Sequence, residues 1–363
     1  MRIAIVLGTR PEIIKMSPII RECQKERLDY FVVHSGQHYT YEMDRLFFEE
    51  LGLPDPKYNL NVGSGSHAEQ TARVLVGVET ILIKEIPDVV LVEGDTNTVL
   101  GAALSAVKLH VDVGHVEAGA RSYDRTMPEE INRILVDHVS EYLFAVTDNG
   151  KKIALGEGIP GEKIFVTGST IVEAINYGLE SVGRTVPCVA GLSPGEEYLL
   201  ATVHREENVE APERLIGIFR GLEMVRDELK LPVVFPAHPR TRKSLEKLGL
   251  GFPRGVLPID PVGYLEFLQL ARNAKLILTD SGGVQMEACI MGVPCVTLRK
   301  STEWVETLEV GANLTAGCEA SDIVRSAKEM LVRSRVWANP FGDGTAAART
   351  IAIIRESLQR RAG

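Results

Sequence analysis

Short runs of Val, Ile and Leu recur along this chain, and a helical pattern follows each of them. In the first half the runs lie at residues 3–7, 30–33, 89–92, 111–116, 142–146 and 164–166. Strands that are apolar throughout, rather than at alternate positions, are typical of parallel sheets buried on both faces. Their alternation with helices predicts a doubly wound α/β domain.

A second series of the same kind begins after a stretch rich in Gly and Pro, residues 183–195, which is suited to a linker. Its apolar runs lie at residues 198–203, 233–237, 256–259, 276–279 and 293–298. We therefore expect an α/β protein of two Rossmann-like doubly wound domains, residues 1–182 and 192–345, that face a central cleft. A final amphipathic helix, residues 346–363, can pack on either domain, including back on the first.

Length and charge narrow the class of protein further. A chain of 363 residues is long enough for about two domains. The net charge of -9 disfavours nonspecific binding to nucleic acid or to an anionic membrane, so an anionic ligand needs a local basic site. The opening apolar run soon meets Arg10 and no long apolar stretch follows, so we expect a cytoplasmic protein without signal peptide or membrane span. The 5 cysteines include no C-x-x-C pair and are interpreted as buried thiols.

A G-x-G-x-x-G pattern at Gly156, Gly158 and Gly161 follows a predicted helix and precedes a predicted strand. The dinucleotide-binding fingerprint requires the opposite order, with the strand before the glycines and the helix after them. The sequence also lacks a Walker A motif, so hydride transfer and ATP hydrolysis lose support. His34 and His38 are spaced for a metal, but Gly36 lies between them and no H-E-x-x-H pattern exists. We expect neither a cofactor nor a metal.

Polar residues follow the strands of the first domain. Arg10 and Lys15 stand near the start of the first predicted helix, where the helix dipole and free N–H groups favour an anion, so they suggest a phosphate site. The alternative is a solvated helix start. Asp95 and Glu117 each follow a strand, and the ends of parallel strands meet at one crevice.

Together with Glu129, at the start of an acidic helix, Asp95 and Glu117 could supply carboxylates for general acid/base catalysis. Each carboxylate also has a structural alternative. Asp95 would then be a helix N-cap, and Glu117 would be an ion-pair partner of Arg121.

In the second domain, His204 follows the first strand and could stabilise a developing diphosphate or donate a proton, although a histidine there is often structural. Ser281, Gly282 and Gly283 lie between a strand and a helix. Glycines without side chains let phosphate oxygens approach a helix N-terminus, so this turn is interpreted as an anion cradle. Glu287 would repel phosphate and suits a ribose. The alternative is a simple strand-to-helix turn.

These residues belong to longer motifs: GTRPEIIKMSP, EGDTNTVLG, HVEAGARS, MPEEINR, HREEN, TDSGGVQMEA and NPFGDG. In them the chain resembles, nearly end to end, the nonhydrolysing UDP-N-acetylglucosamine 2-epimerases, which share the two-domain architecture of the B-type glycosyltransferases. The resemblance implies a cytoplasmic homodimer that acts on a UDP-sugar and needs no nicotinamide. The catalytic residues that it implies are Asp95, Glu117, Glu129 and His204. The UDP-sugar contacts that it implies are Arg10, Lys15, Val262, Phe267, Ser281, Gly282, Gly283 and Glu287.

One departure from the family bears on the substrate. Trp304 and Val305 stand where many members have Arg-Pro, and this pair resembles relatives that act on diacetamido-glucuronic acid nucleotides. The loop from Pro11 to Lys15 looks more like the N-acetylglucosamine branch, so both substrates stay open. A glycosyltransferase, a hydrolysing epimerase and a noncatalytic UDP-sugar sensor stay open as rival functions.

Overall fold

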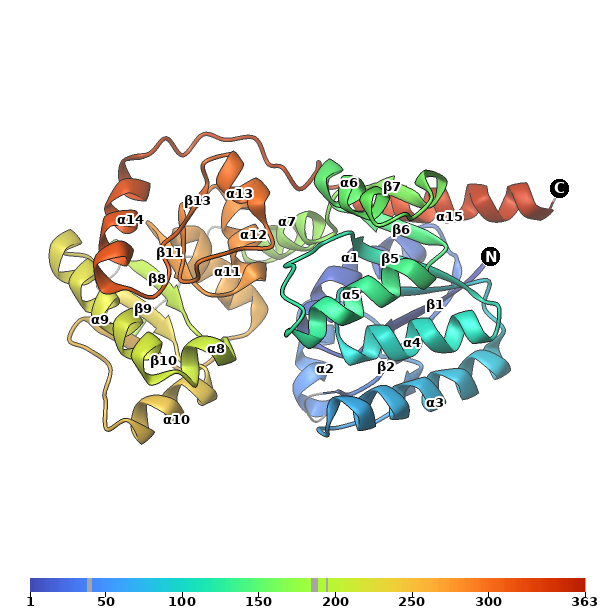
Figure 1. Ribbon diagram of the computed structural model, residues 1–363, viewed down its shortest axis with the longest axis horizontal. Helices are drawn as coiled ribbons and strands as arrows, with labels where there is room; N and C mark the ends of the chain where they lie inside the picture. Colours follow the sequence, from blue (N-terminus) through green and yellow to red (C-terminus); the bar gives the residue numbers. More distant parts are fainter. Residues whose placement is uncertain (38–40, 184–188, 194, 363) are drawn as a thin grey trace. The chain divides into compact units, whose positions relative to one another are not determined.

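The computed structural model describes residues 1–37, 41–183, 189–193 and 195–362 (Figure 1). The chain forms two compact units, one of Met1–Asn176 with Phe341–Gly363 and one of Tyr177–Pro340. Part of the linker predicted at residues 183–195, namely residues 184–188 with Cys188 and residue 194, lies outside the described residues. The boundary between the two units lies within a helix, between Asn176 and Tyr177.

The first unit contains a seven-stranded parallel sheet in the order β3-β2-β1-β4-β5-β6-β7. Every apolar run predicted here forms a strand, and most of these strands are buried along their length, whereas Val166 at the end of β7 is exposed. The two-residue β3 was missed, since it contains no apolar run. The strands are β1 (Arg2–Leu7), β2 (Asp29–His34), β3 (Tyr58–Asn59), β4 (Val89–Glu93), β5 (Asp112–Ala118), β6 (Tyr142–Ala145) and β7 (Ile164–Val166).

The helices of this unit are α1 (Arg10–Lys25), α2 (Tyr41–Glu50), α3 (His67–Glu85), α4 (Asn97–Lys108), α5 (Pro128–Val139), α6 (Asp148–Gly156), α7 (Ile171–Val182), which continues into the second unit, and α15 (Ala346–Ala362). Side chains of α3, α4 and α5 pack on one face of the sheet in a common apolar core. Helix α15 lies along α1 in this unit, where Arg355 pairs with Glu26. A capping box starts α3, with Ser66 and Glu69 bonded to each other's backbone.

The second unit contains a six-stranded parallel sheet in the order β10-β9-β8-β11-β12-β13. Its strands are β8 (Leu199–Thr202), β9 (Val233–Pro236), β10 (Val256–Ile259), β11 (Ile277–Thr279), β12 (Cys295–Thr297) and β13 (Asn313–Thr315), of which only β13 was not predicted. Its other helices are α8 (Glu206–Val209), α9 (Pro212–Leu229), α10 (Pro239–Lys247), α11 (Tyr264–Asn273), α12 (Gly282–Ile290), α13 (Val305–Glu309) and α14 (Ala320–Val332). Two doubly wound parallel α/β domains confirm the predicted fold class.

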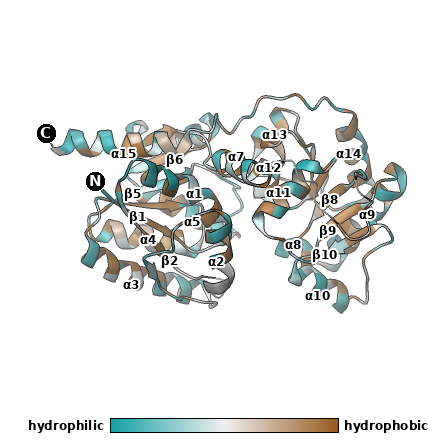
Figure 2. Cartoon of the chain, turned by 180° about the vertical axis from the view of Figure 1, so that it is seen from behind, coloured by the Kyte–Doolittle hydropathy of each residue, from teal (hydrophilic) through white to brown (hydrophobic). Residues whose placement is uncertain are grey.

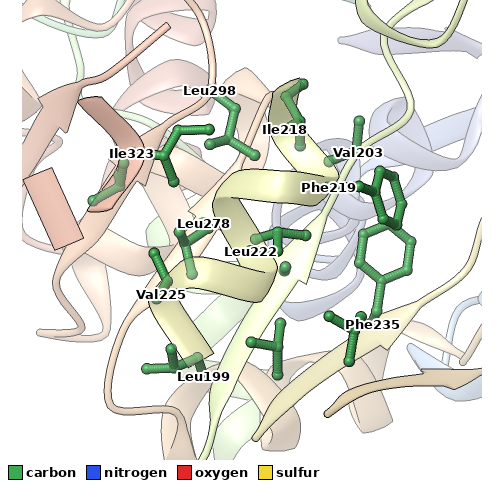
Figure 3. Packing of buried hydrophobic residues seen from close by; sticks show 14 of the residues in the cluster. Leu199, Val203, Ile218, Phe219, Leu222, Val225, Phe235, Leu278, Leu298 and Ile323 are labelled. Carbon is green, nitrogen blue, oxygen red and sulfur yellow. The ribbon is translucent and has the colours of Figure 1, made fainter. Parts of the chain in front are cut away.

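Each unit has its own apolar core. In the second unit, Ile218 and Leu222 of α9 pack over strand residues such as Leu278, as Figure 3 shows. Figure 2 colours the chain by hydropathy. The strands are mainly brown (hydrophobic), whereas the outer parts of α10 and α15 are mainly teal (hydrophilic). Among the helices in the described ranges, none is both long and apolar enough to cross a membrane.

Candidate active site

Four of the predicted site residues lie where the sheets reverse their strand order. In the first unit the reversal lies between β1 and β4, and in the second between β8 and β11. Ligands of open α/β sheets bind at the carboxyl ends of the strands beside such a switch point. The residues shortly after these four strands include Arg10, at the start of α1, and Asp95, His204 and Ser281, each in a loop.

Lys15 of α1 is clamped between two carboxylates. Its Nζ lies 2.7 Å from both oxygens of Glu117 and 2.9 Å from Oε1 of Glu93, and only 14% of its side chain is exposed. Burial alone would lower the pKa of Lys15, but the charges of Glu117 and Glu93 outweigh it and raise that pKa above its usual range. The alternative of a solvated helix start therefore does not fit Lys15. Arg10, one turn earlier, lies 4.9 Å from the ring centroid of Phe47.

Glu117 sits in an irregular part of β5. Its φ is +68°, in the left-handed region that non-glycine residues seldom occupy, and the register with β6 shifts between Val116 and Ala118. Arg121 pairs with Asp137 and Glu157, each at 2.7 Å. The alternative in which Glu117 serves as the partner of Arg121 is therefore wrong, and Glu117 is left to Lys15.

Asp95 is held by Arg133 of α5, which donates to its carboxylate at 2.9 and 2.7 Å. The N-cap of α4 is Thr96, whose hydroxyl oxygen accepts the N–H of Val99. The alternative of Asp95 as a helix N-cap is therefore wrong. Glu129 lies half-buried in the first turn of α5, and no described residue pairs with it.

Glu12 is a buried carboxyl group that sequence reasoning missed. It accepts the N–H groups of Gly8 and Thr9 and, at 2.6 Å, the hydroxyl of Thr96, so it ties the loop after β1 to the loop after β4. Burial raises the pKa of Glu12 to about 7, against the opposing effect of these hydrogen bonds. A sequence signal exists, because Thr9 and Glu12 have the same capping-box spacing as Ser66 and Glu69 at the start of α3.

In the second unit, buried Asp280 organises the loop that carries His204. Its carboxylate accepts the backbone N–H of His204 at 3.1 Å, that of Arg205 at 3.0 Å and Nδ2 of Asn208 at 3.1 Å. Desolvation of the His204 ring lowers its pKa, with help from Arg205 and Arg240, and outweighs the attraction of Asp280. The imidazole is therefore mainly uncharged at pH 7.

The turn at the start of α12 is open on one side and closed on the other. Ser281 is the N-cap of α12. A Cβ built on Gly283 would meet only the Oγ of Ser281, at 3.9 Å. A Cβ on Gly282 would collide with Glu303, a carboxylate that pairs with Arg205 and Arg299. Gly282 is thus required by packing, while Gly283 leaves room beside the helix N-terminus. Glu303 was not predicted, because its partners are distant in sequence or unmarked by any motif.

The remaining predicted contacts lie on the same side of this unit's core. Glu287 is buried in α12; burial, followed by the Glu287 charge, raises the pKa of Tyr264 well above its usual range. Val262 and Phe267 are half-buried against the apolar cluster that also contains Leu270. The side chain of Trp304 is buried beside the α12 turn.

Comparison with known proteins gives a consistent match. The profile of the UDP-N-acetylglucosamine 2-epimerase family matches residues 21–355. The UDP-N-acetylglucosamine 2-epimerase of Methanocaldococcus jannaschii is 51% identical over 361 residues, which cover 98% of this chain and 99% of that protein. The UDP-2,3-diacetamido-2,3-dideoxy-D-glucuronate 2-epimerase of Pseudomonas aeruginosa is 41% identical over 353 residues, covering 96% and 98%.

Solved structures match over the same length. The crystal structure of Methanocaldococcus jannaschii UDP-GlcNAc 2-epimerase in complex with UDP-GlcNAc and UDP has a TM-score of 0.91 and 49% identity, and the match covers 98% of this chain and all of that one (100%). The kitacinnamycin glycotransferase, at 12% identity and a TM-score of 0.57, shares the fold alone, with 98% and 94% covered. The architecture is that of the B-type glycosyltransferases.

Proposed function

The chain belongs to the UDP-N-acetylglucosamine 2-epimerase family and is therefore an isomerase, and on that premise we propose that it interconverts UDP-N-acetylglucosamine and UDP-N-acetylmannosamine. The observation that carries this proposal is a pair of carboxylates in the first unit, each held by a cation. Glu117 is held by Lys15 and Asp95 by Arg133, so both are fixed in position before any substrate arrives. Such preorganised acid and base groups are what inversion at a carbon centre requires.

The chemistry requires departure of the nucleotide. The hydrogen on carbon 2 is not adjacent to a carbonyl group, so its removal to a free carbanion would be too slow. In the proposed anti elimination, a base takes this proton while the bond from carbon 1 to the UDP oxygen breaks. The products are 2-acetamidoglucal and UDP. In the syn readdition that follows, UDP oxygen rejoins carbon 1 and a proton reaches the other face of carbon 2, so that no proton is gained or lost overall.

We assign the proton transfers to Asp95, Glu117 and Glu129, with one taking the proton and another returning it. The contrast among their surroundings supports a division of roles: Asp95 and Glu117 each face a cation, whereas no described residue pairs with Glu129. A cation beside a carboxylate stabilises its ionised form, which is the form that accepts a proton.

In this proposal the nucleotide is held by the second unit. The Ser281 hydroxyl and the N–H groups of Gly282 and Gly283 take the diphosphate, because the Ser281 N–H already donates to Thr279 Oγ1 at 3.0 Å, and Glu287 takes the ribose. Uncharged His204 donates a hydrogen bond to the departing UDP, while Arg10 supplies positive charge where negative charge develops. The half-buried Val262 and Phe267 contact the uracil ring of the nucleotide.

The test is incubation with UDP-N-acetylglucosamine in the absence of any acceptor, followed by proton and phosphorus NMR. We expect UDP-N-acetylmannosamine to appear while free UDP does not accumulate. Accumulation of UDP would identify a hydrolysing epimerase instead. An unchanged substrate would contradict the proposal, and acceptor-dependent consumption or tight binding without turnover would then point to a transferase or a sensor.

Trp304 supports a second candidate substrate, the UDP-diacetamido-glucuronic acid on which the relative from Pseudomonas aeruginosa is named to act. An indole here replaces the cation common in the family, and it is buried next to Gly282. The same NMR assay with both sugars decides between them. A larger kcat/KM for the diacetamido-glucuronate would select the second candidate.

We also propose that the enzyme works as a cytoplasmic homodimer, as the family resemblance implies. An apolar row on α3 supports association: Val76 and Ile83, seven residues apart on one helix face, are 60% and 62% exposed, and Ile86 at the end of α3 is 77% exposed. Sedimentation analysis of the wild type should give twice the mass of one chain. Val76→Glu should shift the measured mass toward that of a single chain. A monomeric wild-type protein would contradict this assembly.

A further inference from the structure

Glu93, the last residue of β4, lies behind the proposed catalytic carboxylates. Its side chain is 2% exposed, and its Oε1 is 2.9 Å from Lys15 Nζ. The other side of the same ammonium lies 2.7 Å from both oxygens of Glu117. Lys15 is thus fixed between an inner carboxyl group, Glu93, and an outer one, Glu117.

The charges in this cluster do not balance if every group is ionised. One ammonium faces two carboxylates, and Glu12 adds a third acidic group nearby on α1. Burial raises the pKa of Glu93 well above its usual range, although Lys15 opposes the shift, and repulsion from Glu117 and Glu12 adds to it. In the neutral form Glu93 still presents an oxygen to Lys15, and the Lys15 charge remains directed at Glu117.

The backbone gives a reason why such an anchor is needed. Glu93 pairs in register with Val116, directly before Glu117, and Glu117 itself has φ +68°. A non-glycine residue in that conformation costs on the order of 1 kcal/mol or more and persists only where its surroundings fix it. Among the described residues, Lys15 is the cation that pairs with Glu117. Glu93 in turn holds Lys15 from the buried side.

We infer that Glu93 is a positioning residue, which fixes Lys15 through its carboxyl oxygen and thereby sets the place of Glu117 at carbon 2 of the sugar. This inference rests on the proposed function for the role of Glu117. Glu93 itself touches no substrate in this scheme. Its contribution is geometric, so an oxygen at this position should be sufficient and a hydrocarbon should not.

The test compares Glu93→Leu, which removes the oxygen, with Glu93→Gln, which keeps it. We expect Glu93→Leu to lower kcat about 10- to 100-fold with KM changed less than about threefold, because a displaced catalytic group affects turnover more than binding. Glu93→Gln should restore kcat to within about threefold at pH 7. In a profile of kcat against pH, the decline on the alkaline side should begin at higher pH in Glu93→Gln than in the wild type. The reason is that Gln cannot ionise and draw Lys15 away from Glu117.

Glu85 offers a matched control. It is also a buried carboxylate of the first unit, paired with Arg2, Lys57 and Tyr58, but it ends α3 and so lies before β4 rather than after it. Glu85→Leu should cost stability and leave kcat within about twofold. Equal losses of kcat in Glu85→Leu and Glu93→Leu would mean that both act only through folding, and would overturn the inference.

A second measurement does not depend on the reaction. Acetylation of Lys15 by an amine-reactive reagent, followed by peptide mass spectrometry, should be at least about fivefold faster in Glu93→Leu than in the wild type, and unchanged in Glu93→Gln and Glu85→Leu. Unchanged acetylation in a folded Glu93→Leu, or a Glu93→Gln as slow in turnover as Glu93→Leu, would overturn the inference. A wild type without epimerase activity would reject the proposed function, while acetylation would still decide the role of Glu93.

Discussion

The two units place different chemistry at the same position of the same kind of sheet. At the switch point of the first unit, charged side chains are held by one another, as Lys15 is by Glu93 and Glu117. At the switch point of the second unit, Gly283 leaves space beside the N-terminus of helix α12, and buried Asp280 holds the neighbouring loop through hydrogen bonds. The fold thus fixes where a ligand can meet each unit, and in our proposal the loop residues decide whether that unit supplies proton transfer or backbone binding.

The largest expected effect lies in the first unit. Asp95→Asn and Glu117→Gln should each lower the epimerisation rate by ~10²- to 10⁴-fold, because each removes a general acid or base. UDP affinity, measured by calorimetry, should stay within about threefold, since the second unit holds the nucleotide in our proposal. If both variants epimerise at wild-type speed, the division of labour between the units is wrong.

The next effect separates the two glycines of the second unit. Gly283→Ala should leave the thermal stability unchanged, because a Cβ there meets open space, but should lower UDP affinity about tenfold by occupying the phosphate position. Gly282→Ala should instead destabilise the free protein by about 1–3 kcal/mol, because its Cβ collides with Glu303. Calorimetry and thermal denaturation measure the two quantities. Wild-type UDP affinity in Gly283→Ala would favour the simple strand-to-helix turn.

A smaller effect concerns a buried acid of the first unit. Glu173 Oε1 accepts the N–H of Ala347 at 2.8 Å at the start of α15, while Oε2 is buried with no partner among the described residues. Burial raises the pKa of Glu173 to about 7, so between about pH 4.5 and 7 the folded protein binds more protons than the unfolded chain. Stability from this group is present below that window and is lost as the pH rises through it.

Glu173→Gln keeps the accepting oxygen and removes the charge. It should therefore raise the free energy of unfolding by about 1–2 kcal/mol at pH 8 and change it little at pH 4. Denaturant titrations at the two pH values measure this difference. An equal effect at both would show that Glu173 does not titrate in this window.

The smallest effect is expected at the surface of the first unit. Arg361 pairs with Asp112 and Glu141, each at 2.7 Å, but 46% of its side chain is exposed. Arg361→Ala should change the free energy of unfolding by less than about 1 kcal/mol, and less at high salt. A larger, salt-independent loss would show that the charged residues of this unit contribute equally wherever they lie.

The sequence predicts the strands well, because burial on both faces leaves a continuous apolar run. It also places Asp95, Glu117, His204 and Ser281 at strand ends, since chain order alone fixes those positions. It does not predict which charges meet. Lys15 and Glu117 are 102 residues apart, and Asp280 lies 76 residues from His204, so these pairs exist only once the sheets have formed. β3 and β13 were missed for a local reason, because neither contains an apolar run.

The most direct test of the proposed proton transfer is the origin of the hydrogen on carbon 2. We would incubate the wild-type protein with UDP-N-acetylglucosamine in deuterated water and examine the sugar by proton NMR. We expect the UDP-N-acetylmannosamine formed to carry deuterium at carbon 2, and Glu117→Gln to slow its incorporation. Product that keeps its original hydrogen there would contradict proton transfer by the carboxylates of the first unit.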